Sequence, residues 1–110
     1  MSNNYLQLLD RLQEFGFSDS QIAALTYSSD RTVQNWRRRR ASPSPLVVQQ
    51  LERVINIVED FRKLINPIVF LDWFFQTNRF LGKSPYKAII DGEYKKLQQL
   101  TLSLAEGPFA

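Results

Sequence analysis

The strongest concentration of chemically capable side chains lies between residues 31 and 40, where five arginines occur with no acidic residue. Their five positive charges exceed the net charge of +3 that the whole chain carries. A guanidinium group makes paired hydrogen bonds to phosphate oxygens and to guanine, and the amides of Gln34 and Asn35 in the same segment can pair with adenine. The segment therefore favours contact with DNA, with a solvated charged face as the alternative.

The chain lacks the side chains on which most enzymes depend, since it contains no histidine and no cysteine. Without imidazole or thiol groups there is no ready general base near neutral pH and no cysteine nucleophile. We therefore expect no catalytic residue, no metal site and no cofactor. Gly82-Lys83-Ser84 resembles the end of a phosphate-binding loop, but that loop needs a glycine where Thr77 stands and a preceding strand. An enzyme is the weakest interpretation.

The elements that must position these residues are predicted to be helices. Apolar residues recur mostly at steps of three and four, glycine and proline are few, and no strand pattern competes. The sequence predicts an all-α fold, and its 110 residues suit one domain or two very small ones. The first helix is expected over about residues 4–15. A second helix begins after a cap at Ser18 or Ser20, and a third begins after a cap at Ser29 and runs into the arginines. Four more are expected over about 45–66, 67–75, 85–91 and 93–105.

The prolines between residues 41 and 45 predict a linker, because each disfavours helical backbone in the residue before it. Pro45 itself suits the first turn of a helix. The predicted organisation is an N-terminal region over residues 1–44, a connecting helix over 45–66 and a C-terminal domain over 67–110. The N-terminus lacks the pattern of a secretory signal, and the most apolar stretch is too short to span a bilayer. We expect a cytoplasmic protein with no membrane partner.

The segment from Ile22 to Trp36 has the pattern of two short helices joined by a tight turn. Ala23 allows close helix packing, Ser29 caps the second helix, and Val33 and Trp36 face inward. The segment resembles the helix-turn-helix of Xre-type (lambda-repressor-like) regulators, which implies that its second helix enters the major groove of double-stranded DNA. The predicted DNA-contacting residues are Ser29, Arg31, Thr32, Gln34, Asn35, Arg37, Arg38, Arg39 and Arg40.

The turn between the two helices departs from that pattern. Tyr27 stands where relatives have glycine, and Ser28 stands where an apolar residue is usual. Because a tyrosine in the left-handed conformation costs about 1 kcal/mol, we expect this turn to be built differently. This departure favours an alternative in which the two helices form a scaffold in a protein-interaction module and bind no operator DNA.

The C-terminal third carries a second pattern. It resembles the toxin-binding domain of the Xre/MbcA/ParS antitoxin family, and the order of the two patterns extends the resemblance over about residues 6–110. The matching positions are Trp73, Asn78, Leu81, Gly82, Ser84, Pro85, Ile89, Ile90, Gly92, Glu93, Glu106 and Gly107. In relatives this domain follows an Xre-like helix-turn-helix, joined to it by a long helix.

The resemblance implies an antitoxin whose C-terminal domain binds a cognate toxin, of the RES-domain or ADP-ribosyltransferase type. It places a loop and the C-terminal tail against that toxin. The implied toxin-binding residues are Leu81, Gly82, Lys83, Ser84, Pro85, Glu106, Gly107, Pro108, Phe109 and Ala110. Phe109 is either an anchor for a pocket in the toxin or an end-cap on the last helix.

The aromatic residues of this third have a simpler interpretation. Five of them could suggest a ligand cage, but aromatics this dense in a small helical domain usually form the core, or otherwise a dimer surface. We assign Trp73 to the core. The five are Phe70, Trp73, Phe74, Phe75 and Phe80.

The functional hypothesis is a DNA-binding antitoxin that represses its own transcription as a homodimer and neutralises its toxin. Two alternatives remain open, namely a solitary helix-turn-helix regulator and an interaction adaptor without a toxin partner. Salt-dependent DNA affinity separates the adaptor from the other two.

Overall fold

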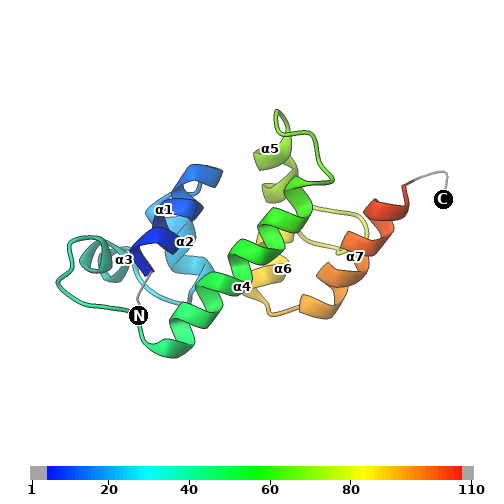
Figure 1. Ribbon diagram of the computed structural model, residues 1–110. Coiled ribbons are helices and arrows are strands. Elements are labelled where there is room, and N and C mark those ends of the chain that lie inside the picture. The colour runs from blue at the N-terminus through cyan, green and yellow to red at the C-terminus, as the bar shows by residue number, and fades with distance from the viewer. Residues whose placement is uncertain (1–4, 108–110) are drawn as a thin grey trace. The chain divides into compact units, whose positions relative to one another are not determined.

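The computed structural model describes residues 5–107, and within them every regular element is a helix (Figure 1). The only β-type pairing in this range is an isolated bridge between Asn78 and Lys83. The predicted all-α class is therefore confirmed. No helix in the described part of the chain is both long and apolar enough to cross a membrane. The helices are α1 (Tyr5–Phe15), α2 (Asp19–Leu25), α3 (Asp30–Arg37), α4 (Pro45–Arg62), α5 (Phe70–Phe75), α6 (Pro85–Ile90) and α7 (Tyr94–Glu106).

The chain divides into two compact units, the first ending at Asn56 and the second beginning at Ile57. The division falls inside α4, so this helix supplies residues to both units rather than lying outside them. The 18 residues of α4 begin at Pro45, where a missing N–H costs nothing because the first helical N–H groups have no partner within the helix.

The first unit packs α1, α2 and α3 together and adds the N-terminal two thirds of α4. Its fully buried side chains include Leu9, Leu12, Ile22, Leu25, Val33 and Leu51. Trp36 is also buried, so the predicted inward face of α3 is confirmed. The Gln50 side chain donates a hydrogen bond to the Leu25 carbonyl at 3.0 Å and so joins α4 to the end of α2.

Short-range capping sets the ends of these helices. The Ser18 side chain accepts from the Gln21 amide and the Gln21 side chain accepts from the Ser18 amide, which completes a capping box at the start of α2. At its other end, the amides of Tyr27 and Ser28 donate to the carbonyls of Ala24 and Ala23. This is a Schellman motif, in which the residue after the cap adopts the left-handed conformation.

Tyr27 takes that left-handed position, with φ of 58°. Our expectation that the turn would be built differently is therefore wrong. The tyrosine adopts a backbone conformation that favours glycine, because the two hydrogen bonds that end α2 require it. The turn that leads into α3 thus keeps the geometry expected for a glycine, despite the change of residue.

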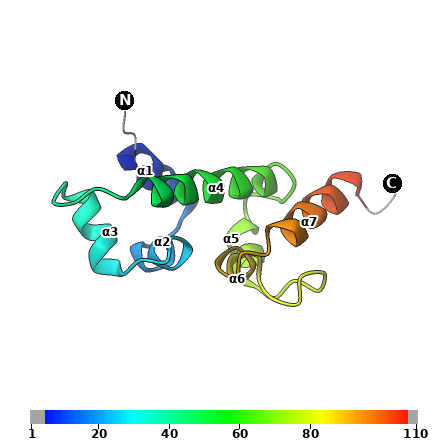
Figure 2. The same cartoon turned by 90° about the horizontal axis from the view of Figure 1, so that it is seen from below.

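The second unit contains the C-terminal third of α4 together with α5, α6 and α7 (Figure 2). Phe61 and Phe74 are completely buried, and the ring of Trp73 lies 5.0 Å from that of Phe61. Phe75 contacts Tyr86 across α5 and α6, with ring centroids 4.9 Å apart. Phe80 is different, since 51% of it is exposed, and its assignment to the core is wrong.

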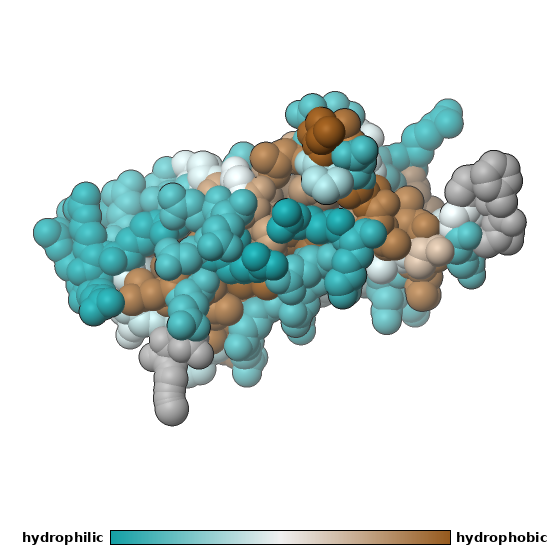
Figure 3. Space-filling model, turned by 45° about the horizontal axis from the view of Figure 1, so that its top comes forward, coloured by the Kyte–Doolittle hydropathy of each residue, from teal (hydrophilic) through white to brown (hydrophobic). Residues whose placement is uncertain are grey.

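The connection between α4 and α5 is longer than predicted. We expected helix as far as Asn66 and again from Pro67, but α4 ends at Arg62 and α5 begins at Phe70. The Asn66 side chain accepts a hydrogen bond from the Ile68 amide at 2.9 Å, which stabilises a turn in place of the helix start. This turn exposes 90% of Ile68, and Figure 3 shows apolar atoms gathered on the surface there.

Candidate functional site

Helix α3 presents a polar surface in the first unit. Its serine cap begins the helix, since the Ser29 hydroxyl accepts from the Thr32 amide at 3.1 Å. The buried Val33 and Trp36 then fix which face points outward. On that face a shallow hollow of about 390 Å³ is lined by Asp30, Arg31, Gln34, Asn35, Arg38 and Arg40.

The hollow brings together five of the nine residues that the sequence predicted for DNA contact. Ser29 and Thr32 lie at the N-terminus of α3, where their hydroxyl oxygens are 2.9 Å apart. Arg39 is exposed just beyond the C-terminus of the helix. The sixth lining residue is an acid, Asp30, and its carboxylate accepts a hydrogen bond from Ser20 of α2. This contact connects α2 to the start of α3.

Arg37 is the residue of the predicted set that the structure places elsewhere. Two nitrogens of its guanidinium lie 2.9 Å from one carboxylate oxygen of Asp19, and a third contact reaches Asp10 at 3.9 Å. Only 24% of the Arg37 side chain is exposed. Because the guanidinium is already paired with carboxylates, we assign Arg37 to the packing of α3 against α2 and α1.

Arg39 has an unusual backbone, with φ of 60°. It is the left-handed residue of a second Schellman motif, in which the amides of Arg39 and Arg40 donate to the carbonyls of Trp36 and Asn35. Reversal of the chain at this point ends α3 directly before the linker. It also leaves Arg38, Arg39 and Arg40 exposed together.

In the second unit, most of the residues predicted to bind the toxin have structural contacts. Leu81 and Pro85 are buried. Ser84 caps α6 by accepting a hydrogen bond from the Lys87 amide at 3.0 Å. Gly82 is exposed and has φ of 75°, a backbone that residues with a side chain rarely adopt. Several residues of the motif that suggested the family therefore determine how this loop folds.

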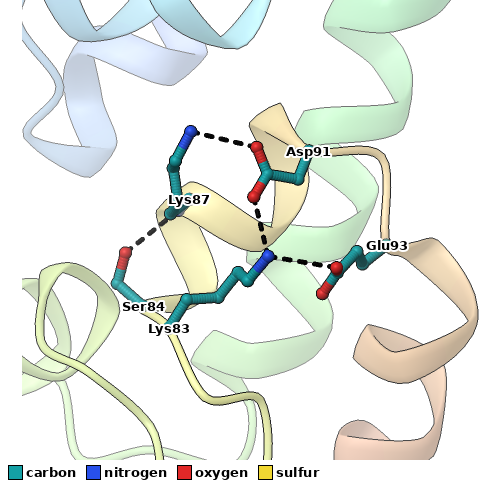
Figure 4. Close-up of polar contacts among 5 residues, drawn as sticks. All are labelled: Lys83, Ser84, Lys87, Asp91 and Glu93. Atoms are coloured by element: carbon teal, nitrogen blue, oxygen red, sulfur yellow. Dashed lines mark hydrogen bonds and ion pairs between the residues drawn. The ribbon is translucent and has the colours of Figure 1, made fainter.

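Lys83 belongs to an ion-pair network, drawn in Figure 4. Its ammonium group lies 2.7 Å from Asp91 Oδ2 and 3.0 Å from Glu93 Oε2. Lys87 donates to the other oxygen of Asp91 at 3.0 Å. We call these four residues the Lys83 network. It joins the loop before α6, the end of α6 and the start of α7.

The network shifts the ionisation of its members. Hydrogen bonds from Lys83 and Lys87 hold the pKa of Asp91 below its usual value of 3.8. Hydrogen bonds to Asp91 and Glu93 raise the pKa of Lys83 above 10.5. Both shifts favour the charged forms, so all the ion pairs persist around neutral pH.

Sequence reasoning missed this network. Lys83, Lys87 and Asp91 occur at four-residue intervals, which is the spacing of neighbours on a helix, and only the pair Lys87–Asp91 lies at that spacing within α6 and its cap. The contact from Lys83 to Glu93 spans ten residues and depends on the fold of the loop.

The predicted tail lies only partly within the described residues. Glu106 ends α7, and Gly107 follows with φ of 74°. Pro108, Phe109 and Ala110 lie outside the described residues, so the two interpretations of Phe109 remain a matter for experiment.

Comparison with known proteins shows similarity over nearly the whole chain. The mycobacterial cidal antitoxin MbcA of Mycobacterium tuberculosis and of Mycobacterium bovis is 24% identical over 99 residues, which cover 89% of this chain and 88% of MbcA. No family model matches the chain.

The fold is found in a solved structure as well. A chain in the crystal structure of the M. tuberculosis MbcT–MbcA toxin–antitoxin complex superposes with a TM-score of 0.78 at 22% identity, covering 99% of this chain and 100% of that one. The resemblance that the sequence motifs indicated is confirmed, because the chain is similar in sequence to the MbcA antitoxins along nearly its whole length and shares its fold with a chain of the MbcT–MbcA complex.

Proposed function

We propose that the protein is an antitoxin that binds and neutralises a cognate toxin through its second unit. The observation that carries this proposal is similarity to the MbcA antitoxins along almost the full length of both chains. The toxin of the proposal is a RES-domain or ADP-ribosyltransferase type enzyme, and the two proteins meet in the cytoplasm. The loop before α6 and the C-terminal tail from Glu106 to Ala110 form the binding surface, and Phe109 is the one large side chain in that tail.

The test uses the protein encoded by the gene that adjoins this chain's coding sequence, which we call the toxin candidate. The tagged chain is expressed with the toxin candidate, purified after nuclease treatment, and compared with a variant that lacks Gly107–Ala110. We expect a stoichiometric complex and loss of growth inhibition with the full chain, and recovery of inhibition with the truncated chain. Growth inhibition that the full chain never relieves, together with no complex, would reject the antitoxin function and leave a solitary regulator.

We further propose that the first unit binds operator DNA as a homodimer, and so represses the gene that encodes it. Two copies of α3 would then enter successive major grooves about one helical turn apart. The hollow on α3 gathers arginine, glutamine and asparagine side chains, which are the donors and acceptors suited to base edges. Arg31, Gln34, Asn35 and Arg38 are assigned to the bases, Arg39 and Arg40 to phosphates, and Ser29 and Thr32 to the DNA-facing N-terminus of α3.

This assignment is tested by separating base contacts from phosphate contacts on promoter DNA and on a scrambled duplex. Replacing Gln34 or Asn35 with alanine should cost about 1–3 kcal/mol of discrimination between the two duplexes. Replacing Arg39 and Arg40 with alanine should weaken binding to both duplexes and reduce the salt dependence. If the two sets of variants act alike on both duplexes, α3 does not read the groove in this way. If the wild-type chain has no salt-dependent affinity for either duplex, the first unit is a scaffold in an adaptor.

A further inference from the structure

The loop between α5 and α6, residues 77–84, is closed by its own hydrogen bonds. The Asn78 amide donates to the Lys83 carbonyl at 2.9 Å, and the Gly82 amide donates to the Asn78 carbonyl at 2.8 Å. The Asn78 side chain accepts from the Leu81 amide at 3.0 Å. The side chain of Leu81 is buried and so anchors the loop to the core of the second unit. The loop is thus a built element that projects from the helices, as its yellow trace in Figure 2 shows.

At the tip of this loop two side chains are exposed that the sequence analysis did not assign to binding. Phe80 exposes 51% of its surface, and the neighbouring Arg79 is exposed as well. Aromatic and arginine side chains are over-represented among the residues that dominate binding energy in protein interfaces. A closed loop that buries Leu81 and exposes the adjacent Phe80 presents that ring in a fixed position.

The Lys83 network holds this loop from its other end. Lys83 lies three residues after Phe80, and its ammonium group reaches the carboxylates of Asp91 and Glu93, which follow the C-terminal end of α6. Glu93 is the residue that caps α7, yet its side chain makes no cap hydrogen bond. One of its oxygens binds Lys83, and the other is buried without a hydrogen-bond partner among the described residues.

Glutamate is not among the residues that favour the N-cap position, so the absence of a side-chain cap at Glu93 follows from its residue type. Its side chain instead makes a contact that spans ten residues. This contact connects the loop to the start of α7 and so restrains the position of the loop relative to that helix.

We propose that Arg79 and Phe80 form a docking tip for the toxin, and that Lys83 is a positioning residue that holds this tip in its binding conformation. The proposal rests on the antitoxin function proposed above. The matching surface on the toxin is an apolar pocket for the Phe80 ring with a carboxylate beside it for Arg79. Between residues 77 and 85, this assigns toxin contact to the tip and a supporting role to Lys83, Ser84 and Pro85.

The first experiment measures the affinity of purified toxin candidate for full-length variants by calorimetric titration. Phe80→Ala should raise the dissociation constant roughly tenfold or more, and Arg79→Ala should raise it by a smaller factor. Ile68→Ala and Lys63→Ala are the matched controls, because both residues are exposed and lie in the same unit. The controls should leave affinity within about twofold. Equal effects of Phe80→Ala and Ile68→Ala would overturn the assignment of the tip.

The second experiment tests Lys83 with Lys87→Met as its control. Both lysines bind Asp91, but only Lys83 also reaches the loop and Glu93. Lys83→Met should increase hydrogen exchange at the Leu81 and Gly82 amides about tenfold and weaken toxin binding, while amides of α1 to α3 stay protected. Lys87→Met should do neither. Where Lys83→Met disrupts the unit, Glu93→Gln weakens the Lys83–Glu93 contact by removing its negative charge, with little change in side-chain size.

A double variant separates positioning from direct contact. If Lys83 acts through the tip, Phe80→Ala combined with Lys83→Met binds no more weakly than Phe80→Ala alone. Additive losses would mean that Lys83 does not act through Phe80. The exchange measurement needs no toxin, so unchanged exchange rejects the positioning role even where the antitoxin function holds. A wild-type chain that fails to bind the toxin candidate rejects the antitoxin function itself.

Discussion

Tyr27 and Arg39 are the non-glycine residues with a positive φ in the described part of the chain, and they lie directly after the ends of α2 and α3 in the first unit. Each follows the C-cap residue of its helix. Its own amide and that of the next residue donate the two hydrogen bonds of a Schellman motif to carbonyls in the last turn of the helix. Gly16 and Gly92 end α1 and α6 in the same way, with glycine in the left-handed position. The chain therefore uses one type of helix end four times and tolerates a side chain at two of them.

This comparison predicts that Tyr27→Gly stabilises the protein. Removal of the strained side chain should raise the free energy of unfolding by about 1 kcal/mol, as measured by denaturant titration. Gly92→Ala is the inverse control, since it places a side chain at φ of 73° and should lower the free energy of unfolding by a similar amount. A loss of stability in Tyr27→Gly would show that contacts of the tyrosine outweigh the strain of its backbone.

Arg37 and Arg40 allow a second prediction, because the two residues occur in one arginine run but have different surroundings. Arg37→Ala breaks the half-buried pair with Asp19 and should lower the free energy of unfolding by about 1 kcal/mol. Arg40→Ala should leave the unfolding free energy within about 0.5 kcal/mol, because Arg40 is exposed. Chemical unfolding of both variants checks this, and equal stability would remove the structural role given to Arg37.

At the scale of elements, helices were predictable where their signals are local. Ser18 and Ser29 cap the helices that they were expected to begin, and Pro85 begins α6. Prediction failed where the conformation of a loop between helices decides which side chains are buried. The exposure of Phe80 follows from the closure of its loop, and no periodicity of aromatic residues distinguishes that ring from the buried Phe74.

The Lys83 network makes the stability of its loop depend on pH. The pKa of Asp91 lies below 3.8 in the folded state, so its ion pairs stabilise the fold above pH 3.8. That contribution is lost as the pH falls through the folded pKa. The pKa of Lys83 lies above 10.5, so its contribution is present below pH 10.5 and is lost as the pH rises through its folded value.

The prediction concerns the stability difference between the wild-type chain and Asp91→Asn. This difference should be constant around neutral pH and should shrink as the pH is lowered below 3.8, when the wild-type carboxylate also becomes neutral. Unfolding curves at a series of pH values measure it. Asp72→Asn, in which an exposed acid of α5 is replaced, controls for the general loss of one negative charge. A difference that stays unchanged in acid would mean that the network contributes nothing through its charges.

At the scale of the whole molecule, the distinctive feature is that both compact units use residues of α4. Leu51 and Val54 are buried in the first unit, and Val58 and Phe61 are buried in the second. The sequence predicted this helix as a connection between domains. Its role in two cores was not predictable from amphipathic spacing, because periodicity shows that a face is apolar but not which elements will cover it.

Asn56 provides a test, because it is exposed in the interior of α4 at the end of the first unit. Asn56→Pro should lower the free energy of unfolding by about 3 kcal/mol or more and impair both proposed activities, the binding of DNA and of the toxin candidate. Asn56→Ala should leave both activities intact. If Asn56→Pro impairs only one activity, the other unit does not depend on an unbroken α4.

The shared helix also limits how such a protein can be recombined with its relatives. A crossover within Pro45–Arg62 would combine, in at least one core, apolar side chains of α4 from one protein with packing partners from another. These side chains would not be matched in shape to their new partners. An exchange of the proposed DNA-binding surface would therefore cut before Pro45, in the proline-containing linker, and an exchange of the proposed toxin-binding surface would cut after Arg62. Chimaeras that respect these two points should fold, and each of the two proposed surfaces could then be replaced without changing the other.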